Sequence, residues 1–327
     1  MSDDALMDLA VEAAATVRTR TAPNPWVGAA ILATDGRTAT GATQPPGGAH
    51  AEVQAFSAAA EAGIGLVGAT LATTLEPCCS TGRTGPCTSA IIDAGISRVL
   101  IGVEDPDTAV QGRGVSALRA AGLEVQIGVR SDAVNEQLVA YLHHRRTGRP
   151  LVVVKLAATI DGRTAAADGT SQWITGNEAQ TDVHQLRAES QAILVGAGTV
   201  RFDDPALTVR HVEGPSPKRI VLGSAPAGAA IHPCLEWRGE LPTLLEQLGA
   251  DGILQLMVEG GANTVAQFQA DGLVDRYVLY LAPAMFGGDD ARPLFVGTGA
   301  PTIDALPRGR FVDIVRLGDD IRIDLAL

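Results

Sequence analysis

Apolar residues along the chain alternate between a helical period and short continuous runs, a pattern typical of α/β proteins. At the start, apolar positions recur at helical spacing from Leu6 to Val17, and VGAAIL (27–32) is a predicted strand. The same alternation continues with helices over 51–63, 86–95, 115–122 and 131–146, and strands over 69–75, 97–103 and 123–129. This order predicts a parallel or mixed sheet covered by helices.

A second α/β unit is predicted to follow the polar stretch HHRRTGRP (143–150), so we divide the chain into domains 1–147 and 148–327. The segment 151–160, LVVVKLAATI, is almost wholly apolar and predicts a buried strand. Helices are expected over 177–189, 241–248 and 262–270, and strands over 191–195, 219–222, 254–258, 274–281, 310–316 and 321–325. Residues 211–218 and 224–239 are predicted loops.

Composition narrows the class of protein. The 327 residues are 46% hydrophobic, enough for two domains, and the net charge of −12 argues against a nucleic-acid partner. No run of 18 apolar residues is present and the first residues lack the features of a signal peptide, so we expect a cytoplasmic protein with no membrane partner. Four cysteines are too few and too clustered for a disulfide framework.

Three residues at predicted βα junctions have the side chains of a zinc site. His50 begins a helix, Cys78 follows a strand, and Cys87 opens the next helix. One imidazole and two thiolates leave the fourth tetrahedral position for water, whose pKa zinc lowers to about 7. Glu52, two residues after His50, is the candidate proton shuttle of a hydrolytic deaminase. A structural zinc site and unrelated buried cysteines remain alternatives, and Cys79 is expected not to be a ligand.

The second half lacks the GxGxxG motif of a standard dinucleotide-binding fold. Residues 259–264, EGGANT, join a predicted strand to a helix, where bare backbone amides suit a phosphate; a capped tight turn is the alternative. Lys155 lies within the apolar strand 151–160 and is expected to face a ligand cleft, because a buried lysine needs a partner. A lysine that snorkels from the strand end is the alternative.

The motifs together resemble the bifunctional riboflavin-biosynthesis deaminase/reductase family over nearly the whole chain. The residues that carry the resemblance are NPWVG (24–28), HAEV (50–53), LEPCCSTGRTGPC (75–87), VKLAATIDGRTA (154–165), SQWIT (171–175), ILVGAGTVRFDDPALTVR (193–210) and VEGGANT (258–264). The resemblance implies a cytidine-deaminase-like αβα domain followed by a dihydrofolate-reductase-like α/β domain. It implies zinc-dependent deamination of a phosphorylated ribosylaminopyrimidine, then NADPH-dependent reduction of the ribosyl chain to ribityl. A homodimer or higher homo-oligomer is also implied.

The resemblance further implies roles for individual residues. His50, Cys78 and Cys87 would bind Zn²⁺, Glu52 would be catalytic, Asn24 would contact the pyrimidine, and Arg83 would contact its phosphate. In the reductase, the expected substrate residues are Lys155, Ser171, Arg187, Arg210 and Glu259. The expected NADPH residues are Ala157, Trp173, Thr199, Asp203, Ser224, Gly261, Ala262, Asn263 and Thr264.

Three positions depart from the pattern common in the family. Thr43 and Ser80 stand where histidines are usual, and Gly85 replaces a common proline. These changes motivate an alternative function, a specialised relative acting on a related aminopyrimidine in another pathway. A nucleic-acid-editing deaminase is disfavoured by the negative charge and the 4% of aromatic residues. A non-catalytic zinc-stabilised binding module is a further alternative, which substitution of Glu52 would test.

Overall fold

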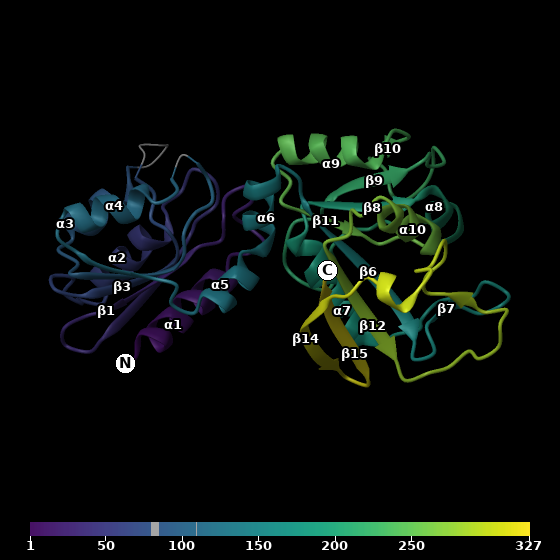
Figure 1. Cartoon of the computed structure of the whole chain (residues 1–327), viewed down its shortest axis with the longest axis horizontal. Coiled ribbons are helices and arrows are strands. Elements are labelled where there is room, and N and C mark those ends of the chain that lie inside the picture. The colour runs from purple at the N-terminus through teal and green to yellow at the C-terminus, as the bar shows by residue number, and fades with distance from the viewer. Residues whose placement is uncertain (80–84, 109) are drawn as a thin grey trace. The chain divides into compact units, whose positions relative to one another are not determined.

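The computed structural model describes residues 1–79, 85–108 and 110–327. It divides into two compact units, Met1–Gly148 and Arg149–Leu327 (Figure 1). The division follows Gly148, one residue beyond the last residue of the first predicted domain.

The first unit is built on a five-stranded sheet in the order β2-β1-β3-β4-β5. Its strands are β1 (Gly28–Leu32), β2 (Thr38–Ala42), β3 (Thr70–Leu75), β4 (Arg98–Val103) and β5 (Glu124–Ile127). β1 runs antiparallel to β2 and β3, whereas β3, β4 and β5 are mutually parallel, so the sheet is mixed. Strand β2 was not predicted, because its sequence TATGA has no long apolar run and contains a glycine.

Helices cover both faces of this sheet. They are α1 (Asp3–Ala15), α2 (Ala51–Glu61), α3 (Cys87–Asp93), α4 (Arg113–Ala120), α5 (Ser131–Gln137) and α6 (Val139–Thr147). A Cβ on Gly28 would lie 1.9 Å from the carbonyl of Ala10 in α1, and one on Gly41 would lie 2.2 Å from the amide of Ala55 in α2. Gly41 pairs with Ala29, the neighbour of Gly28, so these glycines face opposite sides of the sheet. Helices α1 and α2 therefore pack on opposite faces, and small residues let both come close.

The second unit contains an eight-stranded sheet in the order β10-β9-β8-β11-β6-β12-β15-β14. The strands are β6 (Leu151–Thr159), β8 (Ala192–Gly196), β9 (Lys218–Leu222), β10 (Leu235–Trp237), β11 (Gln255–Val258), β12 (Arg276–Ala282), β14 (Arg310–Leu317) and β15 (Asp320–Ala326). The first six strands in this order, β10, β9, β8, β11, β6 and β12, are mutually parallel. Strand β15 is antiparallel to both of its neighbours, β12 and β14. The carboxyl ends of six parallel strands therefore meet along one edge.

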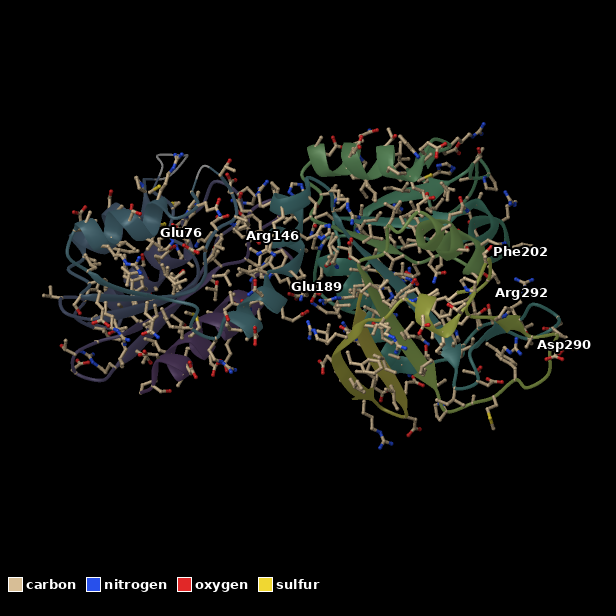
Figure 2. The ribbon with its side chains drawn as sticks, in the orientation of Figure 1. Glu76, Arg146, Glu189, Phe202, Asp290 and Arg292 are labelled. Atoms are coloured by element: carbon tan, nitrogen blue, oxygen red, sulfur yellow. The ribbon has the colours of Figure 1, made fainter. Side chains whose placement is uncertain are left out.

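The helices of this unit are α7 (Asn177–Glu189), α8 (Ala197–Asp203), α9 (Leu241–Ala250) and α10 (Ala262–Ala270), with a 3₁₀ turn at Ile303–Ala305. A separate ribbon pairs β7 (Arg163–Ala165) with β13 (Arg292–Pro293). Side chains fill the space between sheet and helices (Figure 2), and the core includes Leu244 of α9 and Phe268 of α10, both fully buried.

Three local expectations differ from the structure. The single helix expected over 131–146 is two helices, separated at Leu138. Residues 197–203 form α8, which was not predicted because one glycine, one threonine and one valine give this short sequence low helical propensity. The predicted loop 224–239 is wrong over Leu235–Trp237, since pairing with β9 makes that short segment an edge strand. Within the described residues, we find no helix of the length and apolarity needed to cross a membrane.

Candidate active sites

The predicted zinc ligands converge in the first unit. His50 is the N-cap residue of α2, Cys78 follows β3, and Cys87 is the first residue of α3. The Nδ1 atom of His50 lies 3.5 Å from Sγ of Cys78 and 3.3 Å from Sγ of Cys87. Tetrahedral zinc with ordinary bond lengths would place an imidazole nitrogen about 3.6 Å from a sulfur ligand. The three side chains therefore fit a zinc ion.

The surroundings of Cys78 favour its thiolate, the form that binds metal. The backbone N–H of Cys87 donates to Sγ of Cys78 at 3.4 Å. The Cys87 thiol and the imidazole of His50 lower the pKa of Cys78 to about 4, against the effect of burial. Within the part of the chain that the structure describes, the metal-binding cluster holds His50, Cys78 and Cys87 and does not include Cys79.

Glu52 is positioned to act beside this cluster. Its side chain points from the first turn of α2, is 3% exposed, and places Oε2 3.4 Å from Sγ of Cys87. Burial raises the pKa of Glu52 above the usual range of a glutamate, which favours a carboxyl that can hold a proton. Glu52 also lines a cavity of ≈ 160 Å³ together with Asn24, Thr43, His50, Cys78, Glu76, Asp105 and Tyr141.

Two acidic residues of this cavity were missed from the sequence. Glu76, labelled in Figure 2, is 3% exposed and accepts hydrogen bonds from the backbone amides of Asp105 (3.3 Å), Gly112 (3.0 Å) and Val115 (3.1 Å). Asp105 accepts from the Tyr141 hydroxyl at 3.1 Å. Glu76 directly follows β3, and Asp105 lies two residues beyond the end of β4. Their position at the carboxyl ends of parallel strands was the sequence signal that could have identified them as site residues.

Of the three positions that depart from the family pattern, the structure describes Thr43 and Gly85, and Gly85 is exposed with no atom within 4 Å of a Cβ placed there. Thr43 is buried in the cavity wall, where its hydroxyl donates to the carbonyl of Val27 and accepts from its amide, both at 3.3 Å. Its hydroxyl is thus already engaged by the backbone. Ser80 and the predicted phosphate contact Arg83 lie outside the described residues.

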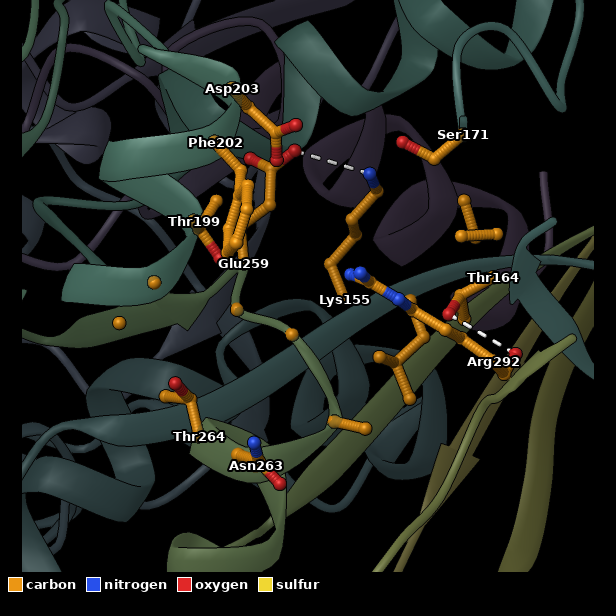
Figure 3. A pocket seen from close by; sticks show the side chains of 18 of the residues that line it. Lys155, Thr164, Ser171, Thr199, Phe202, Asp203, Glu259, Asn263, Thr264 and Arg292 are labelled. Carbon is orange, nitrogen blue, oxygen red and sulfur yellow. Dashed lines mark hydrogen bonds and ion pairs between the residues drawn. The ribbon is translucent and has the colours of Figure 1, made fainter. Parts of the chain in front are cut away.

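The second unit has a larger cleft, of ≈ 1370 Å³, at the carboxyl edge of its parallel strands. Figure 3 shows Lys155 of β6 reaching toward Glu259, with side chains from α8, α10 and β13 around them. The predicted residues that line this cleft are Lys155, Ala157, Ser171, Trp173, Arg187, Thr199, Asp203, Arg210, Glu259, Gly261, Ala262, Asn263 and Thr264. Ser224 is not in the lining. Its hydroxyl accepts a hydrogen bond from the guanidinium of Arg238, and Arg238 does line the cleft.

A compact charge cluster lies in this cleft. Nζ of Lys155 is 3.1 Å from Oε1 of Glu259, and Arg187 binds both carboxylate oxygens, at 2.8 and 2.9 Å. Burial alone would raise the pKa of Glu259, but Lys155 and Arg187 lower it to about 2. Lys155 therefore faces the cleft and has a partner, and Arg187 is not an unpaired surface arginine.

The glycines at the start of α10 allow close packing at the strand ends. A Cβ on Gly196, at the end of β8, would lie 2.4 Å from Oγ1 of Thr264, and one on Gly260 would lie 2.7 Å from its Cβ. Gly261 is the N-cap residue and supplies no side-chain cap. The first turn of α10 thus presents backbone amides at the cleft, as an anionic group requires.

Aromatic side chains in the cleft are unusually exposed. Trp173 is 72% exposed and Phe202 is 79% exposed, and the guanidinium of Arg292 lies 5.9 Å from the Phe202 ring centroid. Phe202 and Arg292 were missed, because only the folded β7–β13 ribbon brings residue 292 to this cleft. Flat, exposed rings beside cations suit a ligand with aromatic groups and phosphates.

Comparison with protein families assigns each unit to a known type. The cytidine and deoxycytidylate deaminase zinc-binding region matches residues 1–103. The RibD C-terminal domain matches residues 150–323.

Whole-chain relatives agree with both assignments. The riboflavin biosynthesis protein RibD of Corynebacterium ammoniagenes is 44% identical over 85% of each chain, and that of Escherichia coli K12 is 35% identical over 100% of each. Among solved structures, Acinetobacter baumannii RibD form 1 has a TM-score of 0.88 and 34% identity, covering 99% of this chain and 98% of that one. A diaminohydroxyphosphoribosylaminopyrimidine deaminase/5-amino-6-(5-phosphoribosylamino)uracil reductase from Thermotoga maritima has a TM-score of 0.87 and 31% identity, covering 99% and 98%.

Proposed function

Since the chain belongs to the RibD family of riboflavin-biosynthesis enzymes, we propose that its two sites carry the family's deamination and reduction steps through the residues described above. The resemblance inferred from the motifs is confirmed, and the chain is a bifunctional deaminase/reductase. What remains to be proposed is the role of each side chain, the identity of the nicotinamide cofactor and the oligomeric state.

In the first unit, His50, Cys78 and Cys87 would hold zinc, and Asn24 in the cavity wall would orient the pyrimidine. When bound, zinc would supply the Lewis acidity that activates a water for attack on the ring. Glu52 would take a proton at its carboxylate and deliver it to the departing ammonia. The burial that raises the pKa of Glu52 supports this role, because a carboxyl of higher pKa holds a proton more readily near neutral pH.

In the second unit, we assign the cleft to NADPH and to the ribose phosphate of the substrate. Parallel α/β sheets bind such ligands beyond the carboxyl ends of their strands, where this cleft lies. The cofactor residues are Ala157, Trp173, Thr199, Asp203, Ser224, Gly261, Ala262, Asn263 and Thr264, with Ser224 outside the lining as described. Lys155, Ser171, Arg187, Arg210 and Glu259 would hold the substrate, and the Lys155–Glu259–Arg187 cluster would fix their positions.

The observation that carries the proposal is the cluster of one histidine, two cysteines and a buried glutamate, of which His50, Cys78 and Glu52 line one cavity. The test is a two-step assay on the phosphorylated diaminopyrimidine, with ammonia release and NADPH oxidation followed separately. We expect Cys87→Ser to abolish ammonia release and to spare reduction of the deaminated intermediate, and Lys155→Ala to show the reverse. Turnover of neither step by the zinc-loaded chain would favour a relative acting on another aminopyrimidine.

We also propose that a second copy of the chain packs on the β14–β15 end of the large sheet. β14 is an edge strand, and Phe311, Ile314 and Ile321 are 63%, 58% and 39% exposed. An apolar edge of this kind marks an association surface. Light scattering should report a dimer or larger oligomer for the native chain and a smaller species for Phe311→Glu; a native monomer at micromolar concentration would refute the proposal.

A further inference from the structure

Arg238 is held at the outermost end of the cleft in the second unit. It follows β10, which pairs in parallel with β9 so that Trp237 lies opposite Leu222. The segments that follow these two strands are therefore neighbours, and the guanidinium of Arg238 donates to the Ser224 hydroxyl. Arg238 lines the cleft and is exposed, whereas Ser224 is half-buried and is not part of the lining.

The backbone that carries Arg238 is well anchored. The indole N–H of Trp237 donates to the carbonyl of Glu240 at 3.1 Å. Gly239 packs against the Trp237 ring so closely that a Cβ there would lie 3.1 Å from Cζ2. These contacts fix the turn on both sides of Arg238, so the backbone that carries its guanidinium is held in place.

The charge of the cleft differs from that of the chain. The chain carries a net charge of −12, yet six lysine or arginine side chains and only three acidic ones line the cleft. Lys155 and Arg187 share the single negative charge of Glu259. The other four cations of the lining, Arg201, Arg210, Arg238 and Arg292, form no ion pair with any described residue, so Arg238 is among the charges available to an anionic ligand.

The position of Arg238 in the sheet indicates which part of a bound dinucleotide it would contact. The proposed substrate residues gather around Lys155 on β6, so the reducing nicotinamide must lie there. In the sheet order, β10 is four strands from β6, a separation of about 19 Å at the usual strand spacing. An extended dinucleotide that follows the carboxyl edge would therefore bring its adenosine ribose toward β9 and β10.

We propose that Arg238, together with Ser224, binds the 2′-phosphate of NADPH and so sets the preference for NADPH over NADH. An arginine near the adenosine ribose is the usual means by which proteins accept a 2′-phosphate, and its planar fork can bind two phosphate oxygens. Ser224 takes part by orienting the guanidinium, through the hydrogen bond that its hydroxyl accepts. This inference rests on the proposed reductase function and names the residues that determine its cofactor.

The test measures binding, so that it does not depend on turnover. NADP⁺ and NAD⁺ are titrated by calorimetry into the full chain, its Arg238→Ala and Arg238→Lys variants, and Arg308→Ala. Arg308 is exposed and lies outside the cleft, so its removal costs the same charge without the proposed contact. Thermal melting confirms that each variant is folded.

We expect Arg238→Ala to weaken NADP⁺ roughly 10- to 100-fold, the range for a hydrogen bond between charged groups, and to change NAD⁺ by less than about twofold. Arg238→Lys should keep part of the preference for NADP⁺ over NAD⁺, and Arg308→Ala should keep all of that preference. Because the arginine is exposed, added salt should also reduce the preference in the native chain and not in Arg238→Ala.

The outcomes separate this inference from the reductase function. Equal weakening of both nucleotides, or no change in either, would overturn the role of Arg238 and leave the reductase in place. The same would follow if the native chain bound both nucleotides with one affinity. If the native chain bound neither, the assignment of the cleft to a nicotinamide cofactor would fail as well.

Discussion

Replacing Glu259 by glutamine should destabilise the second unit strongly at neutral pH and much less in acid. The substitution preserves size but removes the charge that balances Lys155 and Arg187. Both cations are nearly buried, with side chains 14% and 10% exposed, and both lie within 3.1 Å of the carboxylate. Glutamine would leave them without a counter-charge in a poorly solvated position.

Two estimates give the size of this effect. The pKa of Glu259 falls from 4.5 to about 2 in the folded chain, which corresponds to about 3 kcal/mol of stability at pH 7. Breaking a buried ion pair by removing one partner typically costs about 3 to 5 kcal/mol. Because the folded pKa is depressed, the stabilisation is complete above about pH 5 and is lost as the pH falls toward 2, with about 2 kcal/mol left at pH 3.5.

The assay is urea unfolding, monitored through the hydrogen exchange of peptides from β6 and β11. These peptides report the second unit alone. The matched control is Glu246→Gln on the exposed face of α9, which removes an equal charge without an ion pair among the described residues. We expect Glu259→Gln to lower the free energy of unfolding by about 3 kcal/mol at pH 7 and the deficit to shrink toward pH 3.5. A deficit that is the same at both pH values, or no greater than that of the control, would refute the reasoning.

Other substitutions test separate parts of the chain. Glu52→Gln should lower ammonia release roughly 10²- to 10⁴-fold while zinc is retained, because it removes the proton carrier; activity within tenfold of the native chain would contradict this role. Glu76→Gln should speed hydrogen exchange at the three amides that donate to it, at a cost of about 1.5 to 3 kcal/mol, and unchanged exchange would show that they do not depend on its charge. Tyr280→Phe removes a 2.6 Å hydrogen bond to Asp182 and should lower the stability of the second unit by about 1 kcal/mol in urea unfolding; an unchanged midpoint would argue against that bond.

The sequence predicted that three residues of the first site lie close together, because they stand at the ends of regular elements. His50, Cys78 and Cys87 each stand at a junction between a strand and a helix, so sheet topology alone brings them together. The long strand β6 was equally clear, since its apolar run is required by burial on both faces.

Features that depend on tertiary contacts could not be predicted in the same way. β2 and β10 are short and gain their structure from pairing with a neighbour, and α8 overrides a weak local propensity. The role of Glu76 requires the chain to fold back and present amides far along the sequence. The place of Arg238 beside Ser224 depends on the register of β9 and β10, which no local pattern in the sequence encodes.

The most direct test of the account is X-ray absorption at the zinc edge of the full chain loaded with one equivalent of metal. The account predicts two sulfur ligands at about 2.3 Å and nitrogen or oxygen ligands at about 2.0 Å, from His50, Cys78, Cys87 and one exchangeable position. A third sulfur from Cys79, or a fourth protein ligand of any kind, would close the position that deamination needs and would contradict the account.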